Sequence, residues 1–424
     1  MARTLYSDAV VHRPLSGEPP LDPGWILVER EQVLGVGTGE APAADETVDL
    51  AGAEVWPGLV NAHTHLYSAL AGRLPWPAER PRGLPRILES IWWRLDRALD
   101  ARSIRVSARL GLAEALRHGA TTVIDHHSSP LATPGSLDLI AREAAALGVK
   151  VGLSFEVTDR NGELPFELGL DENLRALAAY ATHPSARVLF GLHASFTLSE
   201  KSLERVADLV PFETPFHLHC AEAEEDLAHA RSLGYESVVD RLAAQGFLRQ
   251  GTLLAHCVHL APGDAELIAE TGAYVAHCPQ SNAHNRVGTA DVMAMLGAGV
   301  RVGLGSDGFA SGMLTEARYA RDQGAERGTL LPRQAAELLL AGGAAIATSV
   351  FGRPLGRLEA GEDADFIVLE PGEGGLSPRR RIHRVVSRGR TVCLDGELPG
   401  VDLAALRAEA DDEAARLWER IQAL

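Results

Sequence analysis

The feature that most constrains the fold is an alternation, between residues 55 and 310, of short apolar segments with longer segments rich in Ala, Leu, Glu and Arg. The short segments are β-branched or aromatic and end in polar residues, whereas the longer ones have helical spacing. Repeated strand-then-helix units imply parallel strands joined by helical crossovers. The eight expected strands are Leu59–Ala62, Thr122–Asp125, Val151–Glu156, Val188–Leu192, Pro215–Leu218, Thr252–Ala255, Tyr274–Ala276 and Val300–Gly305.

Eight parallel strands with interleaved helices fit a closed barrel, in which the chemistry gathers at the carboxyl ends of the strands. An open doubly wound sheet would alternate in the same way, but no GxGxxG motif follows the first strand. We therefore predict an α/β fold in which residues 57–354 form a (β/α)8 TIM barrel.

The two ends of the chain have a different pattern. Residues 1–56 and 355–400 contain short alternating segments broken by Gly and Pro. Neither piece alone could bury one face of a sheet, so we expect the two to combine into one small composite β-sandwich. The expected strands there are Thr4–Val11, Trp25–Glu29, Gln32–Gly35, Thr47–Leu50, Asp365–Leu369 and Ile382–Val386 through Val392.

Helical spacing returns near residues 332–350 and in the final segment, residues 401–424. The final segment predicts an amphipathic helix that packs on the barrel or on a partner subunit, and we expect a homo-oligomer. Its apolar positions are Leu403, Leu406, Leu417, Ile421 and Leu424.

Charge and composition restrict the partners. The formal net charge of −17 makes nucleic acid and anionic membranes poor partners. Met1–Val10 lacks a basic start followed by an apolar core, and no apolar run is expected to reach the roughly 20 residues of a membrane helix. We therefore expect a cytoplasmic protein that binds a small molecule. The four cysteines have no CxxC spacing, so we expect them to be buried apolar residues: Cys220, Cys257, Cys278 and Cys393.

Histidines or carboxylates follow seven of the eight expected strands. Scattered structural histidines would not keep to one end of the strands, so their convergence indicates a metal site. These residues are His63, His65, Asp125, His126, His127, His193, His217, His219, Glu222, His256, His259, His277 and Asp307.

Strand geometry allows several of these side chains to reach one ion. Residues i and i+2 of an extended segment point the same way, so His63 and His65 can share a metal. A histidine from the fifth strand and a carboxylate from the eighth would complete a shell of three nitrogens and one oxygen. An open position for water is typical of catalytic rather than structural zinc, and Zn²⁺ or Fe²⁺ fits such a shell.

Several motifs resemble the amidohydrolase superfamily, in order and across nearly the whole chain. Within it, the chain is most similar to the branch of cytosine and guanine deaminases and triazine hydrolases, and closest to the aminohydrolases called SsnA-like. The superfamily motifs are Pro57–His65, His219–Glu222, Ala255–Leu260 and Gly305–Gly308, and those of the SsnA-like group are Ile91–Arg97, Asp125–His127 and Gly191–Thr197.

The resemblance implies roles for individual residues. His63, His65, His219 and Asp307 would bind the metal, and Glu222 would be the proton shuttle. His256 would lie beside the reacting carbon, and His193 would contact the substrate. The only lysines are Lys150 and Lys201, and neither follows a suitable strand. A second metal bridged by a modified lysine is therefore not expected, and we predict one divalent ion per chain.

The predicted reaction is hydrolytic deamination of a purine-, pyrimidine- or pterin-like heterocycle. A hydroxide bound to the metal would attack the amino-bearing carbon, and Asp307 would accept the proton of the water. Glu222 would protonate the ring, and ammonia would leave. The alternative is hydrolysis of another C–N or C–Cl bond, in a formimino, amide or triazine substrate, at the same site. A non-catalytic binding protein would not need an open metal position.

The sequence allows more than one role for several other side chains. Of Trp92 and Trp93, we expect one to lie in the core and the other to stack on a planar substrate; Trp92 is the one assigned to the substrate, and the role of Trp93 stays open. His127 is expected to contact the substrate or to be structural, and Asn282 to cap a helix. Ser68 stands where guanine-type deaminases have glutamine, which argues against a guanine-like ring contact.

Overall fold

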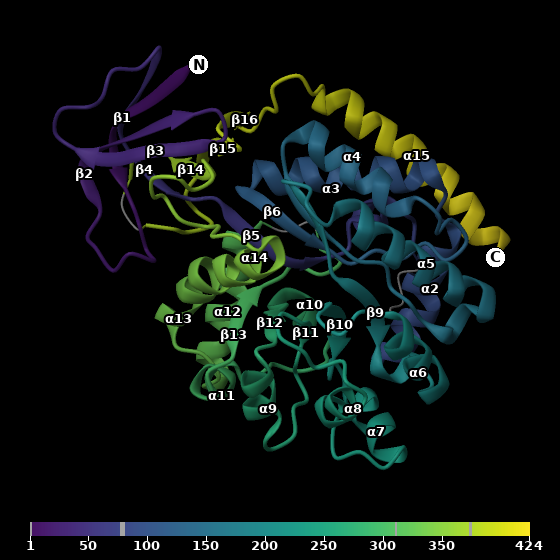
Figure 1. The fold of residues 1–424 in the computed structure, drawn as a ribbon. Helices are drawn as coiled ribbons and strands as arrows, with labels where there is room; N and C mark the ends of the chain where they lie inside the picture. The colour runs from purple at the N-terminus through teal and green to yellow at the C-terminus, as the bar shows by residue number, and fades with distance from the viewer. Residues whose placement is uncertain (1, 77–80, 310–311, 373–374) are drawn as a thin grey trace.

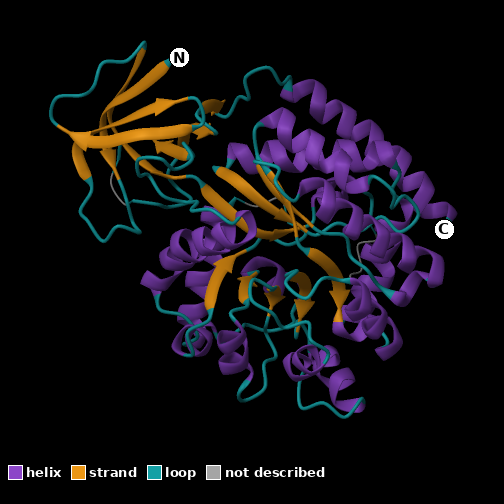
Figure 2. Cartoon of the chain, viewed as in Figure 1, coloured by secondary structure: helices purple, strands orange, loops and turns teal. Residues whose placement is uncertain are grey.

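The structure is a computed structural model that describes residues 2–76, 81–309, 312–372 and 375–424. Its centre is a set of parallel strands surrounded by helices, with a separate group of strands at one corner (Figures 1 and 2). We call residues 59–351 the βα domain and the corner group the end-strand sheet.

The strands of the βα domain form two sheets in which every pairing is parallel. One has the order β5-β6-β7-β8, and the other has the order β13-β12-β11-β10-β9. Nearly all of their residues are buried, which explains why the sequence shows apolar runs rather than alternation. The strands are β5 (Leu59–Thr64), β6 (Ala120–Asp125), β7 (Lys150–Leu153), β8 (Ala186–Val188), β9 (Phe190–Ala194), β10 (Phe216–Cys220), β11 (Leu253–His256), β12 (Tyr274–His277) and β13 (Arg301–Leu304).

Two expected strands differ from those observed. The expected fourth strand, 188–192, is divided at Leu189 into β8 and β9. The reason is that Leu189 donates its backbone N–H to Leu153, whereas Phe190 donates to Pro215 on the opposite side. The expected third strand ends at Leu153 rather than Glu156, and the residues after it pair with neighbours only through isolated bridges.

Backbone contacts also connect the edges of the two sheets. The N–H of His65, just after β5, donates to the carbonyl of Asp307, just after β13, over 3.1 Å. Thr64 and Asp307 form a parallel bridge at the same place. At the other edge, β8 and β9 are separated by a single residue. The first and last strands of the βα domain therefore lie side by side.

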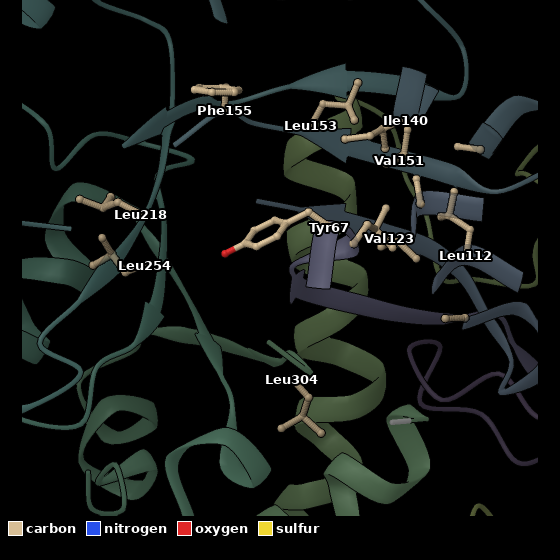
Figure 3. Packing of buried hydrophobic residues seen from close by; sticks show 14 of the residues in the cluster. Tyr67, Leu112, Val123, Ile140, Val151, Leu153, Phe155, Leu218, Leu254 and Leu304 are labelled. Carbon is tan, nitrogen blue, oxygen red and sulfur yellow. The ribbon is translucent and has the colours of Figure 1, made fainter. Parts of the chain in front are cut away.

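Helices cover the strands, and their apolar faces provide the main core. Leu112 of α3 and Ile140 of α4 pack with Val123 and Val151 of the strands beneath them (Figure 3). The helices of the domain are α1 (Leu84–Ile87), α2 (Trp93–Ala98), α3 (Ala101–Arg117), α4 (Ser136–Leu147), α5 (Glu163–Tyr180), α6 (Glu200–Leu209), α7 (Glu224–Ser232), α8 (Val238–Ala244), α9 (Asp264–Thr271), α10 (Pro279–Asn285), α11 (Val292–Gly297), α12 (Met313–Arg327), α13 (Pro332–Glu337) and α14 (Gly343–Phe351), with short 3₁₀ turns η1 (Leu66–Arg73), η3 (Asp159–Asn161) and η4 (Ser195–Thr197) and π turns η2 (Leu88–Trp92) and η5 (Leu338–Gly342).

The end-strand sheet combines both ends of the chain. Strand β14 pairs antiparallel with β4, so the order is β16-β15-β14-β4-β1-β2-β3 in one seven-stranded sheet rather than two separate sheets. Register shifts beside Asp8 and Ala51, both with positive φ, bend β1 and β4. Its small core includes the edge-on rings of Tyr6 and Phe366. The strands are β1 (Arg3–Val11), β2 (Leu21–Glu29), β3 (Gln32–Thr38), β4 (Glu46–Pro57), β14 (Phe366–Leu369), β15 (Ile382–Ser387) and β16 (Arg390–Leu394).

The C-terminal helix α15 (Leu403–Ala423) lies along α3 and α2 of its own chain (Figure 1). Trp418 contacts Trp76 with ring centroids 5.4 Å apart. Arg420 donates to the carbonyl of Ala98 over 2.7 Å. Leu403, Leu406, Leu417 and Ile421 are buried as the helical spacing predicted, whereas Leu424 follows the helix and is exposed.

One segment is more apolar than expected. Among the described residues, Arg333–Phe351 is long and apolar enough to cross a membrane by length and composition alone, with a mean hydropathy of 1.4. Its η5 and α14 parts pack on β13 and β5, and Phe351 shares a buried cluster with Val60. Packing against the strands accounts for its apolar character.

Candidate active site

Four side chains converge at the carboxyl ends of β5, β10 and β13. The Nε2 atom of His65 lies 3.1 Å from Nε2 of His219 and 2.9 Å from Oδ1 of Asp307. Nε2 of His63 lies 3.6 Å from the same carboxylate oxygen. These are the four residues expected to bind a metal.

Two of the histidines are oriented by backbone carbonyl groups. Nδ1 of His65 lies 2.6 Å from the oxygen of His126, and Nδ1 of His219 lies 2.8 Å from that of His193. A carbonyl oxygen only accepts, so each Nδ1 must carry the proton and donate it. The Nε2 atoms of both rings face the centre of the cluster and are the nitrogens left to bind a cation.

His63 is oriented by a chain of side chains. The hydroxyl of Ser154 donates to the oxygen of Asp125 and therefore accepts from Nδ1 of His217, 2.9 Å away. Nε2 of His217 then accepts from Nδ1 of His63 over 2.8 Å. His217 lies two residues before His219 on β10, so its side chain points to the same side of the strand, where it holds His63 in place.

The donor set fits a divalent cation of intermediate softness. Nε2 of His63 is buried and has no hydrogen-bond partner among the residues that the structure describes, which is costly unless a ligand is bound there. His63, His219 and Asp307 also belong, with His256, to a group of side chains whose ligand atoms lie within 4.8 Å of one another, and His65 and His126 join His63 and His219 in a second such group. Three imidazole nitrogens and one carboxylate oxygen are the ligands of an open catalytic site.

The protonation of the cluster is set by burial and by Asp307. Burial lowers the pKa of His63 to about 4. Burial also lowers that of His65, but the Asp307 carboxylate opposes it and the pKa of His65 is raised to about 9. Burial raises the pKa of Asp307, but the neighbouring imidazoles of His63 and His65 outweigh it and hold that pKa well below its usual value. A bound cation must therefore displace the His65 proton.

The backbone turns sharply where the strands end. Ala221, His256 and Asp307 have φ values of 48°, 74° and 54°, in the left-handed region that non-glycine residues seldom adopt. Such conformations gather at active sites, where the surrounding structure holds them. Here they follow or end β10, β11 and β13 and turn the chain beside the metal-binding cluster.

Glu222 and His256 lie beside the cluster. Oε2 of Glu222 is 3.8 Å from Nε2 of His256. Burial raises the pKa of Glu222, and the nearby charge of Asp307 adds to this. Nδ1 of His256 lies 2.8 Å from Oδ1 of Asn282 and donates to it. Asn282, expected to cap a helix, therefore contacts His256 instead.

A pocket with about 650 Å³ of empty space opens above these side chains. Trp92 lies in the π turn η2, and π turns are often found at functional sites. Nδ1 of His193 donates to the hydroxyl of Thr197 over 2.8 Å, which leaves its Nε2 free. The predicted site residues that line the pocket are His65, Trp92, His193, His219, Glu222 and Asp307.

The structure places two aromatic residues whose roles the sequence left open, His127 and Trp93. His127 is fully buried and is not among the residues that line the pocket; it bonds to Ser129 over 2.9 Å and packs edge-on against Tyr67. This placement agrees with the alternative in which His127 is a structural residue. Trp93, whose role the sequence left open, lines the pocket together with Trp92, and the Arg160 guanidinium lies over its ring.

The sequence analysis missed four polar residues that line the pocket: Glu156, Arg160, Ser281 and Asn285. Burial raises the pKa of Glu156 to about 7, and its Oε1 lies 3.3 Å from Nδ1 of His65. A signal for Glu156 existed, because it is the last residue of the expected third strand and fills the one strand end without an assigned polar side chain. Arg160 is paired with Asp96 through an ion pair that no local motif indicates.

The sequence matches the model of the amidohydrolase family over residues 55–392. This chain belongs to the amidohydrolase family. A protein named 5-methylthioadenosine/S-adenosylhomocysteine deaminase from Halobacterium salinarum is 32% identical over 94% of this chain and 94% of its own. A 5'-deoxyadenosine deaminase from Methanosarcina mazei is 29% identical over 88% of this chain and 87% of its own.

Solved structures share the fold of this amidohydrolase. An adenosine deaminase from Xanthomonas campestris with bound zinc has a TM-score of 0.85 at 23% identity, covering 99% of each chain. An atrazine chlorohydrolase from Arthrobacter aurescens with zinc has a TM-score of 0.81 at 22% identity, covering 98% of this chain and 100% of that one. The fold is therefore the TIM-barrel type of the amidohydrolases.

Proposed function

We propose that this amidohydrolase is a metal-dependent hydrolytic deaminase of a nitrogen heterocycle, with adenosine-like purines as the first substrates to examine. The observation that carries the proposal is a pocket with aromatic walls that is lined by Glu222, Asp307, His65 and His219, with Nε2 of the buried His63 3.6 Å from the Asp307 carboxylate. The relatives whose names describe deaminases of adenosine derivatives support the choice of ring.

The proposal includes one divalent ion per chain, zinc first, held by His63, His65, His219 and Asp307. When bound, such an ion lowers the pKa of a water molecule and supplies a nucleophile at neutral pH. We also propose that the two sheets of the βα domain form one closed barrel, since the backbone of His65 bonds to that of Asp307 across their edges.

Two carboxyl side chains, those of Asp307 and Glu222, carry out the proton transfers. Asp307 takes up the proton of the attacking water. Glu222, whose pKa is raised by burial, holds a proton and delivers it to a ring nitrogen, which makes the neighbouring carbon more electrophilic. Oxygen adds to that carbon, the amine receives the proton that Asp307 took from the water, and the C–N bond breaks to release ammonia. The proton left on the added oxygen passes to Glu222, so that a carbonyl group forms and both carboxyl groups return to their starting states. His256 stabilises the tetrahedral intermediate.

The walls of the pocket would hold the ring. Trp92 offers an indole face to a planar substrate, and His193 offers its free Nε2. The hydroxyl of Ser68 lines the pocket but donates to the carbonyl of His65 over 2.7 Å. Ser68 therefore supports the metal-binding loop rather than replacing a ring-binding glutamine.

Location and assembly also belong to the proposal. We propose a cytoplasmic homo-oligomer whose only other partner is a small molecule. Helix α15 packs on its own chain, so a subunit interface would have to use other surfaces.

Ammonia release from a heterocycle panel tests the activity. The zinc-loaded protein is expected to release ammonia from at least one of adenosine, 5'-methylthioadenosine, S-adenosylhomocysteine and 5'-deoxyadenosine. Guanine, a pterin and atrazine complete the panel, and chloride release from atrazine would favour the alternative hydrolase. No product from any compound would contradict the proposal.

Glu222→Gln tests the proton shuttle. The amide keeps the shape of the side chain but cannot carry the proton, so we expect zinc content to stay at the wild-type level and kcat to fall by roughly 10²- to 10⁴-fold. Wild-type turnover in this variant would remove Glu222 from the proton transfers. Glu224→Gln, two residues along at the exposed start of α7, is the matched control.

His219→Ala tests the metal-binding set. Losing one of three imidazole ligands should lower the zinc bound per chain, measured by elemental analysis after dialysis against zinc-free buffer. His183→Ala is the control, because that histidine lies in the loop between α5 and β8, away from the cluster. A full complement of zinc in His219→Ala would exclude this residue as a ligand.

A further inference from the structure

Helix α10 carries three polar side chains that each reach a different group of the site. The hydroxyl of Ser281 donates to Oδ2 of Asp307. Asn282 accepts from Nδ1 of His256 over 2.8 Å. Asn285 donates from Nδ2 to Oε1 of Glu222, at 3.4 Å. Residues 281 and 285 are four apart and so lie on the same face of the helix.

The side chains of α10 do not serve the helix itself. The residue at its N-cap, Cys278, makes no side-chain capping bond. Ser281 and Asn282 are nearly fully buried, and the side-chain bonds described for both go to the site and to Asn285 rather than to the backbone of α10. A capping role therefore does not explain these residues.

Both ends of α10 are fixed to neighbouring elements. At its start, the N–H of Gln280 donates to Glu316 of α12, and Gln323 of α12 donates to the carbonyl of Pro279 over 3.2 Å. Beyond its end, His259 donates from Nε2 to the carbonyl of Val287 over 2.6 Å. The helix is therefore a rigid support rather than a loose connection.

The donor and the acceptor of each hydrogen bond along this face can be assigned. Nδ2 of Asn285 also lies 3.4 Å from the hydroxyl of Ser281, so its two N–H groups can serve Glu222 and Ser281 together. The proton of Ser281 is then directed to Asp307. The two carboxylates are thus joined by one bridge, Glu222–Asn285–Ser281–Asp307, in which both carboxylates accept.

We propose that Ser281, Asn282 and Asn285 are positioning residues through which α10 sets the mutual orientation of Asp307, His256 and Glu222. Ser281 holds Oδ2 of Asp307 so that Oδ1 faces the histidine cluster. Asn282 keeps the proton of His256 on Nδ1 and leaves Nε2 free toward Glu222. Asn285 holds the Glu222 carboxylate in one orientation. The kinetic part of this proposal rests on the proposed deaminase function.

Zinc affinity tests the Ser281 contact without any turnover. Partners of ligating side chains typically contribute 10- to 100-fold to metal affinity. Ser281→Ala is therefore expected to bind zinc about tenfold more weakly in competition with a chelator, and Ser281→Thr, which keeps the hydroxyl, to bind within about twofold of wild type. Ala283→Ser, on the exposed side of the same helix, is the matched control. Unchanged affinity in Ser281→Ala would overturn the proposal for Ser281.

Zinc-bound crystal structures test the other two contacts. Asn285→Leu is expected to leave the Glu222 carboxylate in a new or multiple orientation, and Asn282→Leu to rotate the ring of His256. If both side chains keep their wild-type orientations in these variants, α10 does not position them. This result is obtained whether or not the protein deaminates any compound, so it is distinguishable from failure of the proposed function.

The kinetic constants provide a further test, because kcat would not change selectively if these residues were merely structural. Small misplacements of catalytic groups cost rate rather than binding, by up to about 100-fold. Asn285→Leu is expected to lower kcat at least tenfold with KM within about twofold. Asn282→Asp, which keeps an acceptor for His256, should recover most of the kcat lost in Asn282→Leu. Equal losses in Asn282→Asp and Asn282→Leu would contradict the role of the acceptor.

Discussion

At the scale of single residues, the site depends on which nitrogen of each histidine carries the proton. Carbonyl oxygens of His126 and His193 fix the proton of His65 and His219 on Nδ1, and His217 does the same for His63. The three Nε2 atoms are therefore available to a cation without any rearrangement of the rings. This preorganisation depends on backbone positions that are distant in sequence.

The protonation of His65 predicts how zinc binding depends on pH. Without a cation, the Asp307 carboxylate raises the pKa of His65 to about 9, so this ring is protonated at neutral pH. Burial lowers the pKa of His63 to about 4 and that of His219 well below its usual value, so neither releases a proton. Zinc must therefore displace one proton from His65, and acid weakens binding.

We expect the zinc association constant to rise about tenfold per pH unit between pH 6 and pH 7. Chelator competition at several pH values measures this slope, and calorimetry in buffers of different ionisation enthalpy measures the released protons. An affinity that stays flat from pH 6 to pH 8 would mean that His65 is already neutral in the metal-free protein.

Glu156 is a pocket residue that the sequence did not predict. The convergence of the four residues proposed as metal ligands could be predicted, because each follows a clear apolar strand and points to the same end of the sheet. Glu156 also lies beyond the end of an apolar strand, because β7 ends at Leu153. The expected strand was too long and included Glu156, so its side chain was not recognised as one that follows a strand. Its partners His65 and His126 follow two other strands, β5 and β6, and only the fold places the three residues together.

At the scale of elements, glycine allows a π turn to lie directly on a strand. Gly342 ends η5, and a Cβ atom there would lie 1.8 Å from the carbonyl oxygen of Val302 in β13. The carbonyl oxygen of Val302 is a backbone atom and the added Cβ would be bonded directly to the backbone, so rotating a side chain cannot relieve the collision. The sequence Gly342-Gly343 therefore fixes how closely this helical segment approaches the sheet.

Gly342→Ala is expected to destabilise the protein by at least about 1–3 kcal/mol, because the helix must retreat from β13. Gly297→Ala is the control: it lies in α11 with nothing within 4 Å of its Cβ position, so we expect a change within about 1 kcal/mol. Urea unfolding followed by circular dichroism measures both. Equal stability of the two variants would show that the contact at Gly342 relaxes easily.

Elements could be predicted where the local pattern decided them. The strand runs and α15 follow from apolar spacing, and most observed bounds lie within a few residues of the expected ones, although β4 continues to Pro57 rather than ending at Leu50. The π turns η2 and η5 could not be predicted, because an inserted residue in a helix depends on what the helix packs against. This matters for the site, since η2 presents Trp92 to the pocket.

At the scale of the whole molecule, the end-strand sheet is joined to the βα domain by a buried ion-pair cluster. Lys150, at the start of β7, is fully buried and pairs with Asp365 and, over 3.0 Å, with Asp363. Asp365 also accepts from the backbone of Arg388, and Arg353 pairs with Asp363 over 2.8 Å. Association of the two chain ends could be predicted because neither buries a face alone, but their joint to the βα domain could not, since Lys150 and Asp365 are 215 residues apart.

Lys150→Met tests whether this cluster holds the two parts together. Removing one partner of a buried ion pair leaves its carboxylates uncompensated, and we expect a loss of about 3–5 kcal/mol in the free energy of unfolding. The other lysine of the chain provides the control, because Lys201 is exposed on α6 and Lys201→Met should change stability by less than about 0.5 kcal/mol. If the cluster is the main joint, limited proteolysis of Lys150→Met should release the end-strand sheet before the βα domain unfolds. Simultaneous loss of both parts would instead mean that they unfold as one cooperative unit.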